Sequence, residues 1–173
     1  TLLCAEALTD FFSYSNAVKG YNADSNIGAG LNNMINPNLD SGRPVLLGVT
    51  GTNGGHAIVC DGYGYHSETM YHHLNMGWAG TDDVWYNLPD ISAGIQFNSV
   101  YKAVYNIYKS GSGEIISGRV LDVDGNPVAD ATVTAEQNGG KTYQATTNYR
   151  GIYALVKLPS NTTFTITAGR KFY

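Results

Sequence analysis

The sequence predicts an α+β fold in two parts, an antiparallel β-sheet with helices followed by a small all-β sandwich. The length of 173 residues and the hydrophobic fraction of 43% provide enough core for one medium domain or two small ones. Helical spacing of apolar residues is confined to the start of the chain, and short strand-like runs follow it. The flexible Ser-Gly-Ser-Gly segment at 110–113 divides the chain into residues 1–109 and 114–173.

Composition excludes several classes of protein. Charged residues make up 14% of the chain, well below the usual quarter, so charge-driven disorder is not expected. A net charge of −4 without a Lys/Arg cluster argues against a nucleic-acid partner. No apolar run approaches the length of about 18 residues that a membrane span needs, so we expect no membrane insertion. Abundant Gly, Tyr, Asn, Thr and Ser are typical of β-rich proteins outside cells.

Two helices are expected in the first part. Apolar residues recur at helical spacing over residues 1–13 and again over residues 27–39. The opening residues already have the pattern of a helix interior, and residues 163–173 stop within or just after a strand. We therefore expect the chain to be a segment of a longer protein.

The strands of the two parts are separated by turn residues. In the first part, the runs with strand character are residues 44–49, 56–63, 70–75, 84–88 and 100–108. In the second part they are residues 114–121, 131–136, 142–147, 151–158 and 163–168. Short strands at such regular spacing, with turns rich in Gly, Asn and Asp, are typical of a sandwich.

A candidate catalytic group stands at the start of the second strand. His56 follows Gly54 and Gly55, which allow an extended ligand to approach the imidazole closely. Asn75 ends the next strand, and an Asn that hydrogen-bonds one ring nitrogen fixes the tautomer and aims the other at a thiol. The indole of Trp78 would shield that bond from water. The pattern predicts half of a Cys-His-Asn constellation, although a structural histidine remains an open alternative.

The same segments resemble a known family. The sequence over about residues 5–108 is similar to the second half of the catalytic domain of the streptopain-type, papain-like cysteine peptidases. The resemblance is carried by Gly54-Gly55-His56-Ala57, Asp61-Gly62, Tyr71-His72-His73-Leu74-Asn75-Met76-Gly77-Trp78-Ala79-Gly80, Pro44-Val45-Leu46-Leu47 and Phe97-Asn98-Ser99-Val100. It implies a papain-like antiparallel sheet half-domain with helices.

By position, the resemblance assigns roles to three residues. His56 matches the catalytic histidine, Asn75 the asparagine that orients it, and Trp78 the second Trp of the family's Asn-Trp-Gly-Trp-Gly-Gly run. Met76 stands where the first Trp is usual, and Ala79 where a Gly is usual. Loss of that Trp removes part of the shield and of the substrate cleft.

Neither cysteine fits the missing nucleophile. Cys4 and Cys60 both lie in apolar runs, so we expect two buried free thiols. Cys60 lies four residues from His56 along one strand, about 13 Å at the usual rise of about 3.3 Å per residue. The family's catalytic Cys starts a helix far upstream, and Cys4 does not match that motif. The resemblance therefore implies that the nucleophile lies outside this chain.

We expect neither a metal nor a cofactor. His72 and His73 are adjacent in a strand and so point to opposite faces. No Cys or carboxylate joins the histidines at a spacing typical of zinc sites.

A second resemblance is carried by Ile116-Ser117-Gly118-Arg119-Val120, Gly125-Asn126-Pro127-Val128, Ala131-Thr132-Val133 and Thr147-Asn148-Tyr149-Arg150-Gly151-Ile152-Tyr153. Through these motifs, residues 114–170 resemble the carboxypeptidase-regulatory-like or transthyretin-like sandwiches, which indicates a fold and little about function. The leading hypothesis is a fragment of a secreted, bacterial cysteine endopeptidase that acts on protein or peptide substrates. The sandwich would bind a surface or a polymer. The alternative is an inactive homologue that acts as a peptide-binding or surface adhesion protein. The peptidase hypothesis requires His56 and Asn75 to share one face of the sheet.

Overall fold

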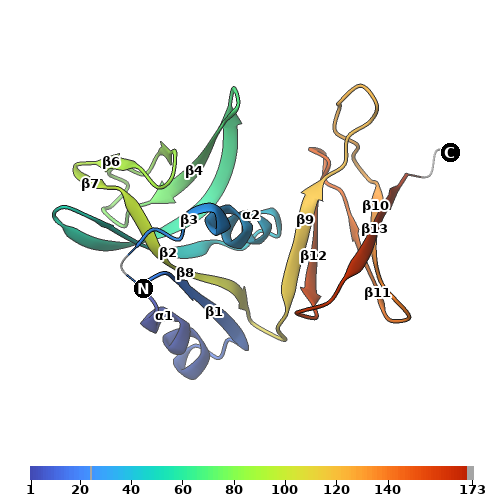
Figure 1. The fold of residues 1–173 in the computed structure, drawn as a ribbon, viewed down its shortest axis with the longest axis horizontal. Coiled ribbons are helices and arrows are strands. Elements are labelled where there is room, and N and C mark those ends of the chain that lie inside the picture. Colours follow the sequence, from blue (N-terminus) through green and yellow to red (C-terminus); the bar gives the residue numbers. More distant parts are fainter. Residues whose placement is uncertain (24, 171–173) are drawn as a thin grey trace. The chain divides into compact units, whose positions relative to one another are not determined.

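The computed structural model describes residues 1–23 and 25–170, which form two compact units (Figure 1). The first unit comprises Thr1–Gly111 and the second Ser112–Tyr173. Both are built mostly from antiparallel β-sheet, with only short helices. Residues 171–173, the end of the expected sandwich, lie outside the described residues.

The first unit is organised around a six-stranded antiparallel sheet with the order β1-β8-β2-β3-β4-β5. Its strands are β1 (Asn16–Tyr21), β2 (Val45–Gly51), β3 (Gly54–His66), β4 (Thr69–Asn75), β5 (Trp85–Tyr86) and β8 (Ser99–Tyr108). A separate two-stranded ribbon is formed by β6 (Ile91–Ala93) and β7 (Ile95–Phe97). The edge strand β1 and this ribbon were not expected, because neither segment has a clear alternation of apolar and polar residues.

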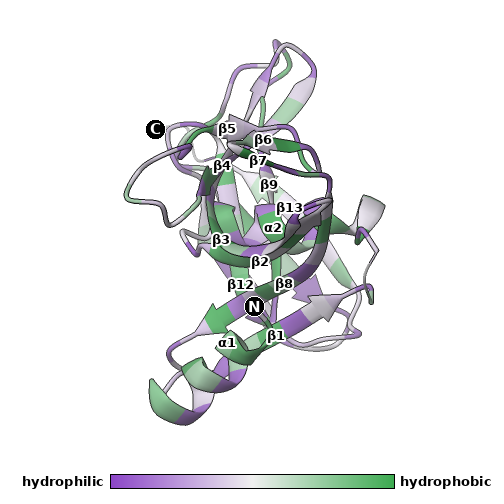
Figure 2. Ribbon diagram, turned by 90° about the vertical axis from the view of Figure 1, so that its left-hand side faces the viewer, coloured by the Kyte–Doolittle hydropathy of each residue, from purple (hydrophilic) through white to green (hydrophobic). Residues whose placement is uncertain are grey.

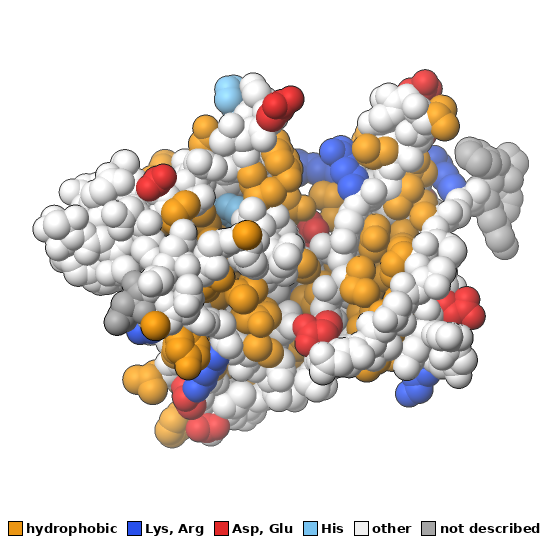
Figure 3. All heavy atoms as spheres, viewed as in Figure 1, with side chains coloured by type: hydrophobic (Ala, Val, Ile, Leu, Met, Phe, Trp, Pro, Cys, Tyr) orange, Lys and Arg blue, Asp and Glu red, His pale blue; other side chains and the backbone are white. Residues whose placement is uncertain are grey.

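Two short helical segments accompany the sheet. The first is α1 (Leu3–Glu6), which continues as a π-helical turn, η1 (Ala7–Phe11). The second is α2 (Leu31–Asp40), preceded by a 3₁₀ turn, η2 (Gly28–Gly30). Figure 2 shows the hydrophobic character of α1, and Figure 3 shows hydrophobic side chains at the surface over it. Leu3 and Phe11 are 79% and 82% exposed.

The core lies on one face of the sheet, under α2. We call this the core face. Its fully buried side chains include Ile35 of α2, Leu47 and Val49 of β2, Ile58 of β3 and Leu74 of β4. The opposite face, the outer face, carries the alternate positions, such as the half-buried Leu46 and Val59. This alternation follows from the period of two along a strand.

A β-bulge changes the faces within β3. The register between β3 and β4 shifts between Cys60 and Gly62, so Asp61 is the extra residue. Before the bulge, Cys60 is buried on the core face opposite Leu74. After it, Tyr63 pairs with the buried His72, and Gly62 and Gly64 take outer-face positions. The bulge thereby decides which side chains each end of this hairpin presents.

The second unit forms two small sheets around a shared core. One sheet has the order β11-β10-β13 and the other pairs β12 with β9. The strands are β9 (Glu114–Arg119), β10 (Thr132–Gln137), β11 (Thr142–Thr146), β12 (Ile152–Leu158) and β13 (Phe164–Gly169). Val133, Ala135, Leu155 and Leu158 are its buried centre. Across the described parts of both units, every helix is too short or too polar to cross a membrane.

Candidate active site

His56 lies near the start of β3, on the core face, where it pairs with Val49 of β2 and is half-buried. The turn that delivers it uses both glycines. Gly54 has φ +111°, a conformation that side chains rarely adopt, and a Cβ at Gly55 would lie 3.1 Å from the Val49 carbonyl oxygen. Both glycines are exposed, so no side chain of the described residues covers the backbone immediately before His56.

A backbone carbonyl fixes the imidazole. His56 Nε2 lies 2.7 Å from the Met76 carbonyl oxygen. Because a carbonyl oxygen can only accept, Nε2 carries the hydrogen and the lone pair of the neutral ring lies on Nδ1. Within the described residues, no hydrogen bond reaches Nδ1. The ring is therefore oriented with one nitrogen anchored and the other available to a proton donor.

Two aromatic side chains stack on this imidazole. The ring of Trp78 lies 4.9 Å from that of His56 with an interplanar angle of 22°. Phe97 of β7, which is buried, lies 6.2 Å away at 17°. Such stacking excludes water from the Nε2–carbonyl hydrogen bond and strengthens it. The structure thus brings His56, Trp78 and Phe97 together.

The loop of residues 76–83 holds these partners in place. The Met76 side chain is fully buried in the core, and its backbone N–H donates to Asp83 Oδ1 at 2.7 Å. The Thr81 N–H donates to the Trp78 carbonyl at 3.1 Å. Ala79, where the family has a Gly, has φ +54°. The loop therefore fixes both the carbonyl that receives the His56 hydrogen bond and the indole beside it.

The expected hydrogen bond between Asn75 and His56 is not formed, and this expectation was wrong. Asn75 pairs with Val59, three residues along β3 from His56, so its side chain belongs to the opposite face of the sheet. It is exposed, and its Oδ1 accepts from the Gly77 N–H at 3.0 Å. The condition that His56 and Asn75 share one face of the sheet therefore fails. The carbonyl of Met76, the next residue, takes the orienting position that the sequence had assigned to the Asn75 amide, and the peptidase proposal below rests on this carbonyl in place of Asn75.

Neither cysteine is placed to act as a nucleophile on His56. Both are free, as expected. Cys60 is fully buried, and burial raises the pKa of its thiol to about 12. Cys4 is only half-buried. It lies in α1, and Thr1, two residues before the start of that helix, stands against Gly48 on the outer face, whereas His56 is on the core face.

The neighbouring histidines have other roles. His72 is 1% exposed, its Nε2 donates to Asn36 Oδ1 of α2 at 2.9 Å, and burial lowers its pKa to about 4. His73 points to the other face, as predicted, and its Nδ1 lies 2.6 Å from Asp61 Oδ1. Among the described residues, no group of three or more His, Cys, Asp or Glu side chains could hold a metal ion.

Sequence reasoning missed the Met76 carbonyl, Asp83 and Phe97. A backbone carbonyl has no residue-type signature, because every residue carries one. The carboxylate of Asp83 lies in a polar loop that resembles any turn. Phe97 was noted only as part of the family resemblance, since its stacking partner is forty-one positions away in sequence.

Comparison with known proteins finds one similar family for each unit. A model of the Peptidase C10 family matches residues 2–86, and a model of the carboxypeptidase regulatory-like domain matches residues 115–173. The solved structure of active wild-type interpain A cysteine protease from Prevotella intermedia is similar at 22% identity and a TM-score of 0.45. That match covers 62% of this chain and 44% of interpain A, so the chain spans less than half of that protein.

No curated protein matches the chain. The two family matches confirm the resemblances that the sequence motifs indicated. The first unit is thus similar to the Peptidase C10 family, the streptopain family of cysteine peptidases, and the second to carboxypeptidase regulatory-like domains.

Proposed function

We propose that the first unit is the histidine-bearing part of a cysteine endopeptidase that cleaves protein or peptide substrates. One observation carries the proposal: His56 Nε2 is anchored on the Met76 carbonyl while Nδ1 is left without a partner among the described residues. A structural histidine in a core is either fully buried or hydrogen-bonded through both ring nitrogens. His56 is half-buried and is hydrogen-bonded through Nε2 only. The match of residues 2–86 to a cysteine peptidase family supports the same chemistry.

In the proposed mechanism, His56 Nδ1 takes the proton of a cysteine thiol that another segment supplies. The thiolate attacks the peptide carbonyl, and the same imidazole then gives its proton to the leaving amine. Water, deprotonated by His56, releases the acyl group from sulfur. Throughout, the Nε2–H remains on the Met76 carbonyl, which stabilises the imidazolium that forms in each step. Donors to the oxyanion would come from the same segment as the cysteine.

Exposed apolar side chains support the presence of further protein on this unit. Leu3, Phe11 and Phe12 are 79%, 82% and 68% exposed, all on α1, η1 and the residue that follows. Large apolar side chains exposed together on one short helical segment are typical of an interface. We further propose that the assembled protein is secreted, with the second unit binding a surface or a polymer.

A second candidate is an inactive homologue that holds peptides without cutting them. The position of Asn75 favours it, because the amide that the family uses to orient the histidine turns to the other face of the sheet. Both candidates predict peptide binding beside His56. Only the first predicts a reactive thiolate.

The test is thiol alkylation in a protein that joins this chain to its cysteine-bearing segment. Iodoacetamide should alkylate the nucleophile rapidly between pH 5 and 7, because an imidazolium partner keeps the thiol ionised at low pH. His56→Ala should slow this reaction sharply at pH 5. Equal rates in the wild type and the variant would remove the peptidase proposal, and absence of any rapidly alkylated thiol would favour the inactive homologue.

The 173-residue chain alone provides the matched control. Any alkylation of Cys4 or Cys60, followed by mass spectrometry, should be independent of His56. Cys60 should be unreactive in the folded state, because its raised pKa leaves almost no thiolate. A His56-dependent reaction at Cys4 would place the nucleophile inside this chain and contradict the proposal.

A further inference from the structure

The outer face of the β3–β4 hairpin carries an aromatic platform unrelated to His56. After the bulge at Asp61, β3 presents Gly62 and Gly64 to this face. Trp85 of β5 lies over both: a Cβ would stand 3.6 Å from the indole at Gly62 and 3.7 Å from it at Gly64. One side of the indole packs on Gly62 and Gly64, which together form the glycine bed, and Trp85 as a whole is still 52% exposed. Its open side is a flat apolar surface.

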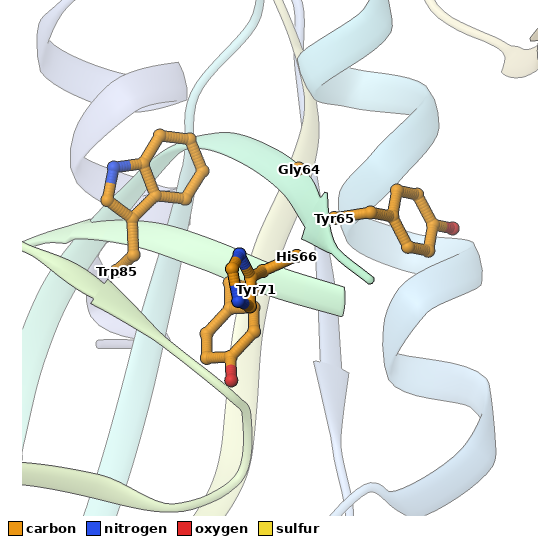
Figure 4. Close-up of a pocket in the computed structure, with 5 residues that line it drawn as sticks. All are labelled: Gly64, Tyr65, His66, Tyr71 and Trp85. Carbon is orange, nitrogen blue, oxygen red and sulfur yellow. The ribbon is translucent and has the colours of Figure 1, made fainter. Parts of the chain in front are cut away.

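Neighbouring groups hold the indole and extend the platform. The ring of His73 meets Trp85 edge-on at 5.3 Å, and His73 is itself bonded to Asp61. Tyr71 pairs with Gly64 and His66 with Thr69, so the register puts Tyr71 and His66 on the same face as the glycines. In Figure 4, Tyr65 points away from Trp85, as strand alternation requires.

These residues enclose a shallow pocket. It has a volume of about 360 Å³ and is lined by Gly64, Tyr65, His66, Tyr71 and Trp85. This is within the range of small-molecule sites, which combine apolar and aromatic walls with a few polar groups. The polar groups here are the Tyr71 hydroxyl and the His66 imidazole.

The absence of charged side chains among the lining residues restricts the class of ligand that the pocket can bind. The lining residues include no Lys or Arg to pair with an anion and no Asp or Glu to pair with a cation. The complementary ligand is therefore neutral, with one apolar face and polar edges. A pyranose ring fits this description, since the C–H bonds of one ring face carry a slight positive charge that meets the negative π-face of an indole. Its hydroxyl groups can then hydrogen-bond at the rim.

We propose that this pocket is a binding site for neutral glycans, with a sugar ring stacked on Trp85 and flanked by Tyr71 and His66. The site is independent of the proposed catalysis. Eight residues of β3 separate His56 from Gly64, about 26 Å at roughly 3.3 Å per residue, and the two lie on opposite faces of the sheet. The site would hold the protein on a polysaccharide while leaving the His56 side free.

The test is affinity electrophoresis of the 173-residue chain in gels that contain one polymer each: hydroxyethylcellulose, laminarin, starch, yeast mannan, polygalacturonate or poly-L-proline. At least one of the four neutral polysaccharides should retard the wild type. Trp85→Ala should weaken that retardation tenfold or more, and Tyr71→Ala should weaken it severalfold. Tyr21→Ala should leave it unchanged, because Tyr21 is equally exposed, at 66%, on β1 at the other edge of the sheet.

Circular dichroism and thermal unfolding would verify that each variant is folded. Tyr71→Ala keeps the test decisive even if Trp85→Ala unfolds, since Tyr71 does not cover the glycine bed. Retention of binding in folded Trp85→Ala, or equal loss in Tyr21→Ala, would overturn the proposal. So would retardation by polygalacturonate or poly-L-proline alone, which would indicate an anionic or a peptide ligand, or the absence of retardation by all six polymers.

Discussion

His56 and His72 occupy the two ends of the same hairpin, on the same core face, and make nearly the same hydrogen bond. His56 Nε2 donates to the Met76 carbonyl at 2.7 Å, and His72 Nε2 donates to Asn36 Oδ1 at 2.9 Å. They differ in what surrounds Nδ1. That of His72 is buried without a partner under α2, whereas His56 is half-exposed at the end of the sheet.

The difference shows that burial separates a structural histidine from a candidate base. Desolvation keeps His72 neutral, with its pKa lowered to about 4, so its imidazole cannot cycle a proton near neutral pH. A similar hydrogen bond at the open end of the hairpin leaves the second ring nitrogen of His56 accessible. The hydrogen bond at Nε2 orients each ring, and solvent access to Nδ1 determines whether the ring can exchange a proton.

The largest expected effect is on catalysis at the open end. In the assembled peptidase, His56→Ala should lower kcat/KM by about 10²–10⁴-fold, because it removes the general base and acid. His72→Gln should leave kcat/KM within a factor of a few. Steady-state hydrolysis of a fluorogenic peptide would measure both.

Asn75→Ala is the matched control for the orienting role. Since the Met76 carbonyl and not Asn75 contacts the imidazole, this variant should lose less than about fivefold in kcat/KM, an effect of about 1 kcal/mol. A loss as large as that of His56→Ala would show that the active enzyme uses a register different from the one described here.

The second effect is on the free energy of unfolding, through His72, which lies toward the turn of the β3–β4 hairpin. The folded pKa of His72 is about 4 and the ordinary value is 6.5, so the unfolded chain binds the extra proton first as the pH falls. Its contribution to stability is complete above about pH 6.5 and is lost between pH 6.5 and pH 4, by about 3 kcal/mol in all. Urea unfolding across this range should show a smaller acid loss in His72→Gln than in the wild type. An unchanged pH dependence would contradict the assignment.

The third effect concerns the loop that carries the Met76 carbonyl. Asp83→Ala leaves the Met76 N–H without its acceptor, which should lower the free energy of unfolding by about 1–3 kcal/mol. Asp82→Asn is the control, because its side chain does not contact Met76 and Asn tolerates the positive φ of 60° at that position. Equal destabilisation by both substitutions would argue against a specific role for Asp83.

The smallest effect comes from backbone strain in the same loop. Ala79 has φ +54°, so Ala79→Gly should raise the free energy of unfolding by about 1 kcal/mol. Ala57→Gly, at an exposed position of β3 with ordinary strand geometry, should have the opposite sign. Chemical denaturation of both variants would test the pair, and a destabilising Ala79→Gly would show that the loop is not strained.

Much of the fold could be predicted from local pattern. The segments 44–49, 56–63 and 70–75 match β2, β3 and β4 in position and type, because each has an apolar run or alternation bounded by turn residues. The strand expected at 84–88 is reduced to Trp85–Tyr86, and β1 was missed. An edge strand such as β1 is defined by its pairing with β8 and has little apolar pattern of its own.

The sequence predicted one contact of the candidate site correctly and one wrongly, and the catalytic roles stay predictions. His56 and Trp78 do meet, at 4.9 Å between ring centroids. Asn75 does not reach the imidazole, because a register that pairs it with Val59 assigns it to the other face. Sequence spacing alone could not show this, since a shift of one residue in pairing reverses every side chain of the strand.

The sequence by itself determined the type and order of most helices and strands, the family resemblance and a histidine that follows two glycines at the start of a strand. The tertiary structure alone decided that a carbonyl orients this histidine, that His72 is buried and that Trp85 lies open on a glycine bed. The physical reason is the bulge at Asp61 and the loop 76–83. Each sets which face a side chain occupies through pairing between strands, and pairing is not encoded in the spacing of residues along one strand.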